Sequence, residues 1–210
     1  ADSMGLLVEA RGLGFRYPDG TEALRGIDLE LHAGETLILF GANGSGKTTF
    51  LLHLNGLLKA SSGELSICGL TPDGKPNLTA LRRKVGMVFQ DADDQLFMPT
   101  VLDDIAFGLL NQGLEPEEAR KAALAALEQV DLGYAAGKAP YHLSGGEKRR
   151  AALAGVLAMQ PELLVFDEPT TALDPPAQRN LARLLSRLPQ AKLISTHDAH
   201  FARAAGTRAV

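Results

Sequence analysis

Three short segments of the sequence hold side chains and glycines that could bind and hydrolyse a phosphate ester. Residues 41–48 read Gly-Ala-Asn-Gly-Ser-Gly-Lys-Thr, residues 143–147 read Leu-Ser-Gly-Gly-Glu, and residues 163–168 read Leu-Leu-Val-Phe-Asp-Glu. The first is a glycine-rich loop, the second reads as a helix start, and the third delivers two carboxylates after an apolar run. Their combination predicts a nucleotide site built from distant parts of the chain.

The glycine-rich segment has the residue types that hold a nucleotide phosphate. With glycine at Gly41, Gly44 and Gly46, backbone N–H groups can turn inward and close on an anion. A helix that begins near Lys47 would add its positive dipole end. The Lys47 ammonium can reach the β- and γ-phosphates, and the Thr48 hydroxyl can bind Mg²⁺. The alternative is an accidental glycine-rich turn, but an apolar strand is expected before the segment and a helix after it.

The two carboxylates follow a strand that we expect at the centre of a sheet. The apolar run 163–166 would place Asp167 and Glu168 at the carboxyl edge, where open α/β sheets bind ligands. Asp167 is then suited to hold Mg²⁺, directly or through water, and Glu168 to orient or deprotonate an attacking water. An acidic turn before Pro169 is the alternative, and the phosphate loop upstream makes it the weaker one.

The serine–glycine segment is a candidate for a second anion site. Ser144, Gly145 and Gly146 stand at an expected helix start, where free N–H groups and a hydroxyl can bind an anion. Ordinary helix capping explains a glycine pair equally well. The segment is not expected to serve its own phosphate loop, so a second copy of the protein or a close relative would have to supply it.

The elements that position these segments alternate between strands and helices. We expect an α/β fold with a P-loop NTPase core, a mostly parallel sheet, an antiparallel β edge and a helical subdomain that carries residues 143–147. The core and edge would span residues 4–90 and 160–210, and the helical subdomain 91–159, within one domain. The expected strands are 6–17, 22–32, 35–40, 64–68, 85–90, 163–166 and 192–195, and the expected helices are 47–57 and 115–130, with another starting near 175.

Composition narrows the function classes. The chain has 210 residues and a net charge of −4, which argues against a general nucleic-acid binder. Its single cysteine excludes an intramolecular disulfide and fits a reducing compartment. No apolar run is long enough to cross a bilayer and no leader precedes the first strand, so a cytosolic or membrane-peripheral protein is expected.

With all three segments considered together, the chain closely resembles the nucleotide-binding subunits of ATP-binding-cassette (ABC) transporters over nearly its whole length. The resemblance implies ATP and Mg²⁺ as ligands. It also implies a second ABC ATPase protomer, identical or different, whose serine–glycine segment faces the γ-phosphate. Closure on ATP and reopening after hydrolysis would drive transport. The implied ATP-binding positions are Tyr17, Gly41, Asn43, Gly44, Ser45, Gly46, Lys47, Thr48, Thr49, Ser144, Gly145, Gly146, Glu147 and Asp174.

Four further residues match single positions of that family. Tyr17 is similar to the aromatic residue that stacks on adenine, and Gln90 to the glutamine that contacts Mg²⁺ and water. His197 matches the histidine at the γ-phosphate, with His200 as the competing candidate. Asp174 is the acidic member of the loop that crosses the dimer interface. The implied catalytic positions are Lys47, Gln90, Glu168 and His197, and the implied metal-binding positions are Thr48, Gln90 and Asp167.

A finer resemblance lies in residues 17–21, 88–97 and 144–150, which are similar to the ATPases of energy-coupling-factor importers, especially the cobalt/nickel branch. It implies an integral-membrane coupling subunit and a substrate-binding membrane subunit as partners, with the chain peripheral to the cytoplasmic face of the membrane. Residues after Gln90 would face the groove that receives the coupling subunit. Family members usually continue well past the histidine, so Val210 suggests a shortened C-terminus.

Three other functions compete with transport. A DNA-repair or chromosome-maintenance ATPase carries a long coiled coil between the phosphate loop and the serine–glycine segment, and the sequence here has no sustained heptads. A translation factor of the cassette type normally carries two cassettes on one chain. A P-loop kinase has no use for the serine–glycine segment. The sequence therefore favours a transport ATPase, without naming the ion.

Overall fold

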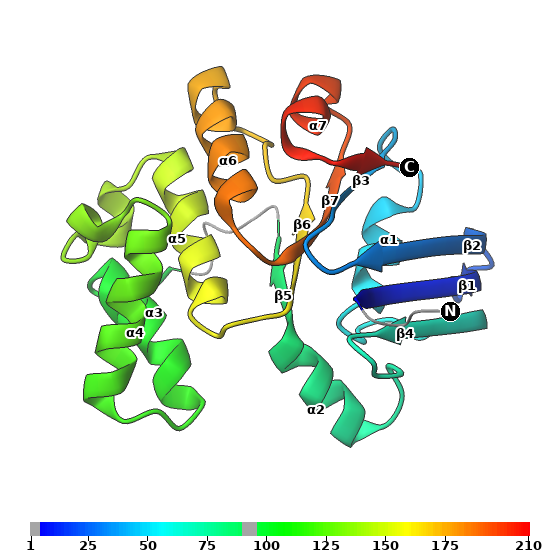
Figure 1. The fold of residues 1–210 in the computed structure, drawn as a ribbon, viewed down its shortest axis with the longest axis horizontal. Coiled ribbons are helices and arrows are strands. Elements are labelled where there is room, and N and C mark those ends of the chain that lie inside the picture. The colour runs from blue at the N-terminus through cyan, green and yellow to red at the C-terminus, as the bar shows by residue number, and fades with distance from the viewer. Residues whose placement is uncertain (1–4, 90–95) are drawn as a thin grey trace.

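The computed structural model describes residues 5–89 and 96–210 and contains two sheets, one antiparallel and one parallel (Figure 1). The antiparallel sheet has the order β2-β1-β4, with β1 at Leu6–Arg16, β2 at Glu22–His32 and β4 at Ser62–Ile67. The parallel sheet has the order β5-β6-β7-β3-β8, formed by β3 (Thr36–Phe40), β5 (Val85–Val88), β6 (Leu163–Asp167), β7 (Ala191–Thr196) and β8 (Arg208–Ala209).

The central strands of the parallel sheet are apolar because both of their faces are covered. Leu164 and Phe166 of β6 pack into one core cluster, together with helices at the left and top of Figure 1. Leu163 and Val165 of the same strand point the other way, into a cluster with the antiparallel sheet. This alternation is the period of two expected of a strand. The parallel sheet is therefore the middle layer of the molecule.

Helices cover the sheet on both sides. One helix, α1 (Lys47–His53), lies between the parallel and antiparallel sheets, and α2 (Lys75–Lys84) leads into β5 (Figure 1). The helices α3, α4 and α5 gather beyond β5, while α6 and α7 cover the sheet near β7. Their bounds are Val101–Asn111 for α3, Pro116–Gln129 for α4, Gly145–Leu157 for α5, Pro175–Arg187 for α6 and Ala199–Ala205 for α7, with 3-10 turns η2 at Gly133–Ala135 and η3 at Pro140–His142.

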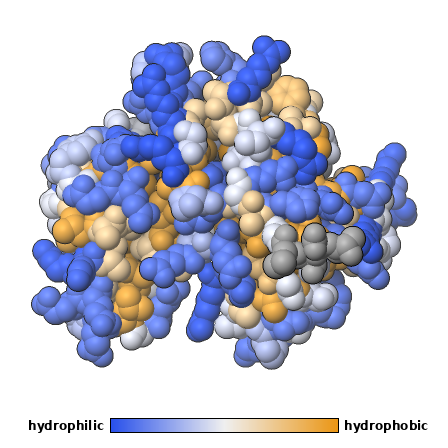
Figure 2. Space-filling model, viewed as in Figure 1, coloured by the Kyte–Doolittle hydropathy of each residue, from blue (hydrophilic) through white to orange (hydrophobic). Residues whose placement is uncertain are grey.

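The face seen in Figure 2 is largely hydrophilic, with apolar side chains emerging between charged ones. Among the described residues no helix combines the length and the apolarity that a membrane crossing needs.

The expected fold class is confirmed, and the differences from the expected elements are local. Helix α1 ends at His53, so the expected end at residue 57 is wrong. The reason is Gly56, whose φ of +73° is left-handed and cannot continue an α-helix. Helix α2 itself was not expected, because it has few apolar residues and only Leu81 of them is buried. Strand β5 ends at Val88, before residue 90.

A substitution at Gly63 tests the packing of β4 against β1 in the antiparallel sheet. Its φ is +82°, and a Cβ there would overlap the backbone carbonyl of Gly12 on β1. Gly63→Ala should therefore lower the free energy of unfolding by about 3 kcal/mol, since backbone must move and φ stays unfavourable. Gly20→Ala is the control: φ is +90° but no atom lies within 4 Å, so a loss of about 1 kcal/mol is expected. Urea unfolding measures the free energy of unfolding of both variants. Equal losses in the two variants would show that the close approach of Gly63 to Gly12 does not contribute.

Candidate functional site

The glycine-rich segment forms a tight loop between β3 and α1. Gly44 has φ +82° and Gly46 has φ +92°, conformations that favour glycine. A Cβ on Gly46 would lie 2.7 Å from the carbonyl oxygen of Ala23, so the loop is pressed against β2. Gly46 is also the residue before the first turn of α1, whose N–H groups open towards the loop. The loop and the helix start together form a cradle suited to an anion.

Lys47 places its ammonium group over this cradle. Its Nζ donates to the carbonyl oxygen of Gly41 at 2.5 Å and to that of Ala42 at 2.7 Å. The same Nζ lies 3.8 Å from Oε1 of Glu168, which comes from the end of β6. The side chain therefore bridges the two sequence segments that were expected to meet, and its charge stands where the phosphates of a nucleotide would be neutralised.

Asp167 stands at the carboxyl end of β6 with two hydroxyl partners. Thr48 Oγ1 donates to its Oδ2 at 3.0 Å, and Ser195 Oγ donates to its Oδ1 at 2.7 Å. A carboxylate beside a threonine hydroxyl is a set of hard oxygen ligands, which is the chemistry that Mg²⁺ prefers. The residues present therefore fit a magnesium ion held between α1 and β6.

Glu168 is the buried carboxylate of the site, with only 8% of the residue exposed. His197 donates from Nδ1 to its Oε2 at 2.9 Å. Its Oε1 faces Lys47, and no hydrogen-bond donor among the described residues reaches that atom. A buried carboxylate whose second oxygen has no hydrogen bond and lies beside Lys47 of the phosphate cradle is suited to accept a proton. His197 is itself exposed at the sheet edge.

Lys47, Thr48 and Glu168 border a cavity of about 770 Å³. Its walls are the loop residues, the start of β2, Glu168 and Tyr17. Tyr17 is half-buried, and its hydroxyl lies 2.8 Å from Thr49 Oγ1 on α1. Its ring meets Phe15 edge to face at 4.9 Å, which fixes the ring beside the cavity. The cavity thus combines a phosphate cradle with an aromatic wall, as an adenine nucleotide requires.

The serine–glycine segment lies elsewhere on the same chain. Ser144 caps α5 in a reciprocal capping box: its Oγ accepts from the Glu147 N–H at 3.2 Å, and Glu147 Oε2 accepts from the Ser144 N–H at 2.8 Å. Gly145 and Gly146 begin the helix beside Asp174, around a separate cavity of about 360 Å³. None of the described residues that line the cavity at Lys47 belongs to α5.

Glu147 is ionised more readily than an ordinary glutamate. The Tyr134 hydroxyl donates to its Oε1 at 2.6 Å, and this hydrogen bond, with that from the Ser144 N–H, lowers the pKa of the Glu147 carboxyl. The same contact raises the pKa of Tyr134. Because the Ser144 Oγ accepts a bond inside the box, its hydroxyl hydrogen stays free to donate outward.

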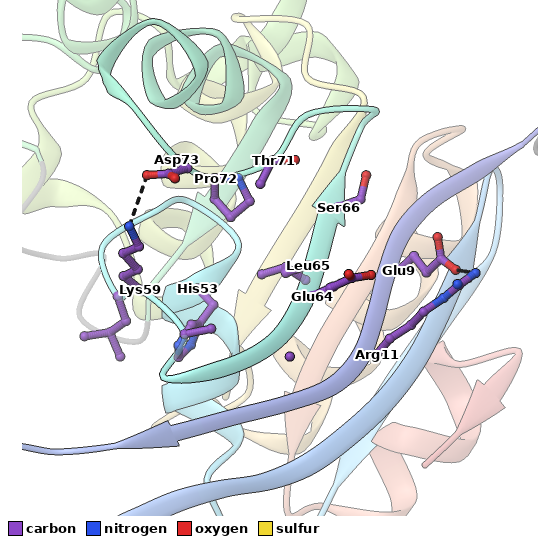
Figure 3. Close-up of a pocket in the computed structure, with 13 residues that line it drawn as sticks. Glu9, Arg11, His53, Lys59, Glu64, Leu65, Ser66, Thr71, Pro72 and Asp73 are labelled. Carbon is purple, nitrogen blue, oxygen red and sulfur yellow. Dashed lines mark hydrogen bonds and ion pairs between the residues drawn. The ribbon is translucent and has the colours of Figure 1, made fainter.

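A third hollow, on the antiparallel sheet, lacks these features (Figure 3). It has a volume of about 480 Å³ and lies between β1, β4 and the segments that flank them. Its cations are already engaged, since Lys59 pairs with Asp73 at 3.2 Å and Arg11 pairs with Glu9. The hollow therefore offers charged side chains that neutralise each other rather than a phosphate cradle.

The structure brings most of the predicted positions together, in two groups. Lys47, Thr48, Asp167, Glu168 and His197 meet at one edge of the parallel sheet. His200, the competing candidate, is exposed on α7 and lines another cavity. Gln90 lies outside the described residues. The second group contains Ser144, Gly145, Gly146, Glu147 and Asp174.

Ser195 was missed by the sequence analysis although it touches two site residues. It lies fully buried on β7 and contacts both Asp167 and Glu168. The available signal was a hydroxyl directly after the apolar pair Leu193 and Ile194, two residues before His197. A buried polar group needs a hydrogen-bond partner, so its position at the carboxyl end of a central strand pointed to the site.

The fold and the site define a P-loop ATPase, and the comparisons with known proteins give its family. A family profile described as ABC transporter matches residues 24–171. The chain is 49% identical, over 199 residues, to the energy-coupling factor transporter ATP-binding protein EcfA of Methanosphaera stadtmanae, covering 93% of this chain and 72% of the relative. The protein therefore belongs to the ABC transporter family and is an ATPase that resembles the energy-coupling-factor type.

Solved structures agree with that assignment. CbiO1 of Clostridium perfringens, described as part of the ABC transporter complex CbiONQ, matches with a TM-score of 0.87 at 38% identity, over 92% of this chain and 79% of that one. The ATP-binding cassette MJ0796, solved as a dimer in a post-hydrolysis state with ADP and phosphate, matches with a TM-score of 0.82 at 31% identity, over 95% of this chain and 91% of that one.

The capping box at Glu147 predicts a pH dependence. A lowered pKa means that the ionised carboxylate stabilises the folded chain at pH values above the ordinary pKa of 4.5, and that this stabilisation is lost as the pH falls below it. Glu147→Gln should therefore be less stable than wild type at pH 7, and the difference should shrink towards pH 3.5. Urea unfolding at several pH values measures it. A difference that is constant with pH would show that the charge does not matter.

Proposed function

We propose that this chain is the ATP-hydrolysing subunit of an energy-coupling-factor importer and that each ATP is bound between two protomers. The observation that carries the proposal is the division of the site within one chain. The cradle and Glu168 line one cavity, and Asp167 and His197 are hydrogen-bonded to Thr48 and Glu168 of its wall, while the Ser144 anion site opens on another cavity. A second protomer facing the first can bring its Ser144 to the exposed side of the cradle.

The hydrolytic half of the site is supplied by one chain. Lys47 neutralises charge on the phosphates, and Tyr17 provides a wall for the adenine. Glu168 accepts a proton from the attacking water through the oxygen that faces Lys47. His197 holds the other oxygen of Glu168 and so fixes the direction of the carboxylate. We further propose that Gln90 contacts the metal and the attacking water.

Asp167 and Thr48 are the residues that would hold Mg²⁺, because their oxygens already lie 3.0 Å apart at the end of β6. When bound, the ion supplies neutralisation of the phosphate charge that develops during hydrolysis. Lys47 acts on the same charge from the loop side. The protein's own contribution is to keep these groups in place before ATP arrives, so that little reorganisation is needed.

The proposed dimer explains why ATP can drive movement. Two ATP molecules would join each phosphate cradle to the facing Ser144 site, and hydrolysis would remove that link. A ligand shifts such an equilibrium only when it binds the closed state more tightly than the open one. Asp174, which caps α6 by accepting from the Ala177 N–H at 2.8 Å, lies beside Ser144 and would border the partner.

We also propose how the chain couples to the membrane. Residues 91–159, with α3, α4 and α5, would form a helical subdomain that moves against the core formed by residues 4–90 and 160–210. An integral-membrane coupling subunit would bind near Gln90, at the cytoplasmic face, and a further membrane subunit would bind the substrate. The likeness to CbiO1 supports this assignment. Cobalt or nickel is the proposed substrate, and the net charge of −4 disfavours nucleic acid as a partner.

Glu168→Gln tests the hydrolytic assignment. The amide cannot accept the proton, so turnover should fall by at least about 100-fold while ATP still binds. ATP with Mg²⁺ should then hold the variant as a dimer in analytical ultracentrifugation. Lys47→Ala is the matched variant, which should lose ATP binding and remain monomeric. Wild-type turnover in Glu168→Gln would remove Glu168 from the mechanism, and unchanged ATP binding in Lys47→Ala would contradict the assignment of the cradle.

Purification in detergent tests the transport assignment. The chain expressed with its native partners should co-purify with integral-membrane proteins. The Lys47→Ala variant should co-purify equally well, because the substitution is in the phosphate cradle and leaves the proposed membrane-subunit surface unchanged. Elemental mass spectrometry of the purified complex should detect cobalt or nickel. Co-purification with ribosomes or DNA in place of membrane proteins would contradict an importer and favour the non-transport ABC ATPases. Another bound metal would contradict only the proposed substrate.

A further inference from the structure

We propose that Ser195 is a positioning residue for ATP hydrolysis, and that its hydroxyl sets both the direction of the Asp167 carboxylate and the backbone of Glu168. The inference rests on the proposed function, because it concerns the residues that are proposed to hold Mg²⁺ and to activate water. The proposed role of Ser195 is based on three of its hydrogen bonds.

Ser195 is directly opposite Asp167 in the parallel ladder between β6 and β7. The residue is fully buried, so water cannot replace its hydrogen bonds. Its Oγ donates to Asp167 Oδ1 at 2.7 Å, a short bond to a charged acceptor. This bond holds Oδ1 at the sheet, while the Thr48 hydroxyl lies 3.0 Å from Oδ2 and 3.2 Å from Oδ1. Ser195 therefore fixes the rotation of the Asp167 carboxylate beside Thr48.

The second partner of Ser195 is the backbone of Glu168. The Glu168 N–H donates to the Ser195 carbonyl oxygen at 3.0 Å and to Ser195 Oγ at 3.1 Å. Glu168 has φ +46°, a left-handed conformation that is unfavourable for a residue with a side chain. Both bonds hold the backbone there. The turned backbone directs the Glu168 side chain to Lys47 and His197 rather than along the strand.

The Glu168 N–H, the Ser195 hydroxyl and the Asp167 carboxylate form a series of hydrogen bonds with a defined direction. The Glu168 N–H donates to Ser195 Oγ, so the hydroxyl hydrogen of Ser195 is left to point at Asp167. Hydrogen bonds in such a chain polarise one another and strengthen in a buried setting. One hydroxyl thus couples the carboxylate assigned to the metal to the carboxylate assigned to the water.

A second hydroxyl bridge in the same sheet, made by the exposed Thr207, provides a control. Thr207 Oγ1 donates to the Thr36 carbonyl oxygen at 2.8 Å and accepts from the Thr36 N–H at 3.1 Å. This hydroxyl also both donates and accepts across the parallel sheet. It lies at the amino end of β3, and neither partner borders the cavity at Lys47. Removing it tests the loss of a hydroxyl bridge in the sheet without a change at the site.

The experiment compares Ser195→Ala with Thr207→Val in the full chain. For Ser195→Ala, kcat should fall about tenfold, because one charge-assisted bond is lost, while KM for ATP should change less than about twofold. The dissociation constant of Mn²⁺, measured by electron paramagnetic resonance with bound ADP, should rise about fivefold. Thr207→Val should leave kcat and Mn²⁺ binding unchanged. Thermal unfolding shows whether both variants are folded.

The outcomes separate this inference from the proposed function. If Ser195→Ala matches Thr207→Val in kcat and in Mn²⁺ binding, Ser195 is only structural and the inference is overturned. Should Ser195→Ala fail to fold, Ser195→Cys keeps a side chain of similar size with a weak donor and should show the same losses. Glu168→Gln serves as the reference: if it hydrolyses ATP normally the proposed function fails, and if it is inactive while both Ser195 variants behave as wild type only this inference fails.

Discussion

The whole site depends on the parallel register of β3, β7 and β6. Phe40 of β3 is opposite Thr196 of β7, and Asp167 of β6 is opposite Ser195. Because all three strands run in the same direction, their carboxyl ends reach one edge and the loops that follow them meet there. The phosphate cradle, the two carboxylates and His197 are brought together by this register, although about 150 residues of chain separate the first from the last.

The same topology keeps the Ser144 site away from that edge. Helix α5 packs with α3 and α4 beyond β5, at the side of the parallel sheet opposite the antiparallel sheet (Figure 1). The cap of α5 therefore presents its anion site at a separate cavity of the same chain. A chain that holds a complete hydrolytic half and a remote second anion site is suited to association with another copy, and this is the physical basis of the proposed dimer.

Much of the fold and of the site was predictable from the sequence, because apolar runs indicate buried strands and glycines indicate tight loops. The cradle at Gly44 and Gly46 and the carboxylates after β6 follow from local patterns alone. Helix α2 did not, since it has few apolar residues and only Leu81 of them is buried. The role of Ser195 could not be predicted either, because its partners are set by the register between strands that are distant in sequence.

The most direct test of the account is a crystal structure of the Glu168→Gln variant with ATP and Mg²⁺. The account predicts a dimer in which ATP lies on the Lys47 cradle of one protomer, and Ser144 of the other protomer donates a hydrogen bond to its γ-phosphate. A structure in which one chain encloses ATP by itself, with Ser144 of either protomer remote from the nucleotide, would contradict it.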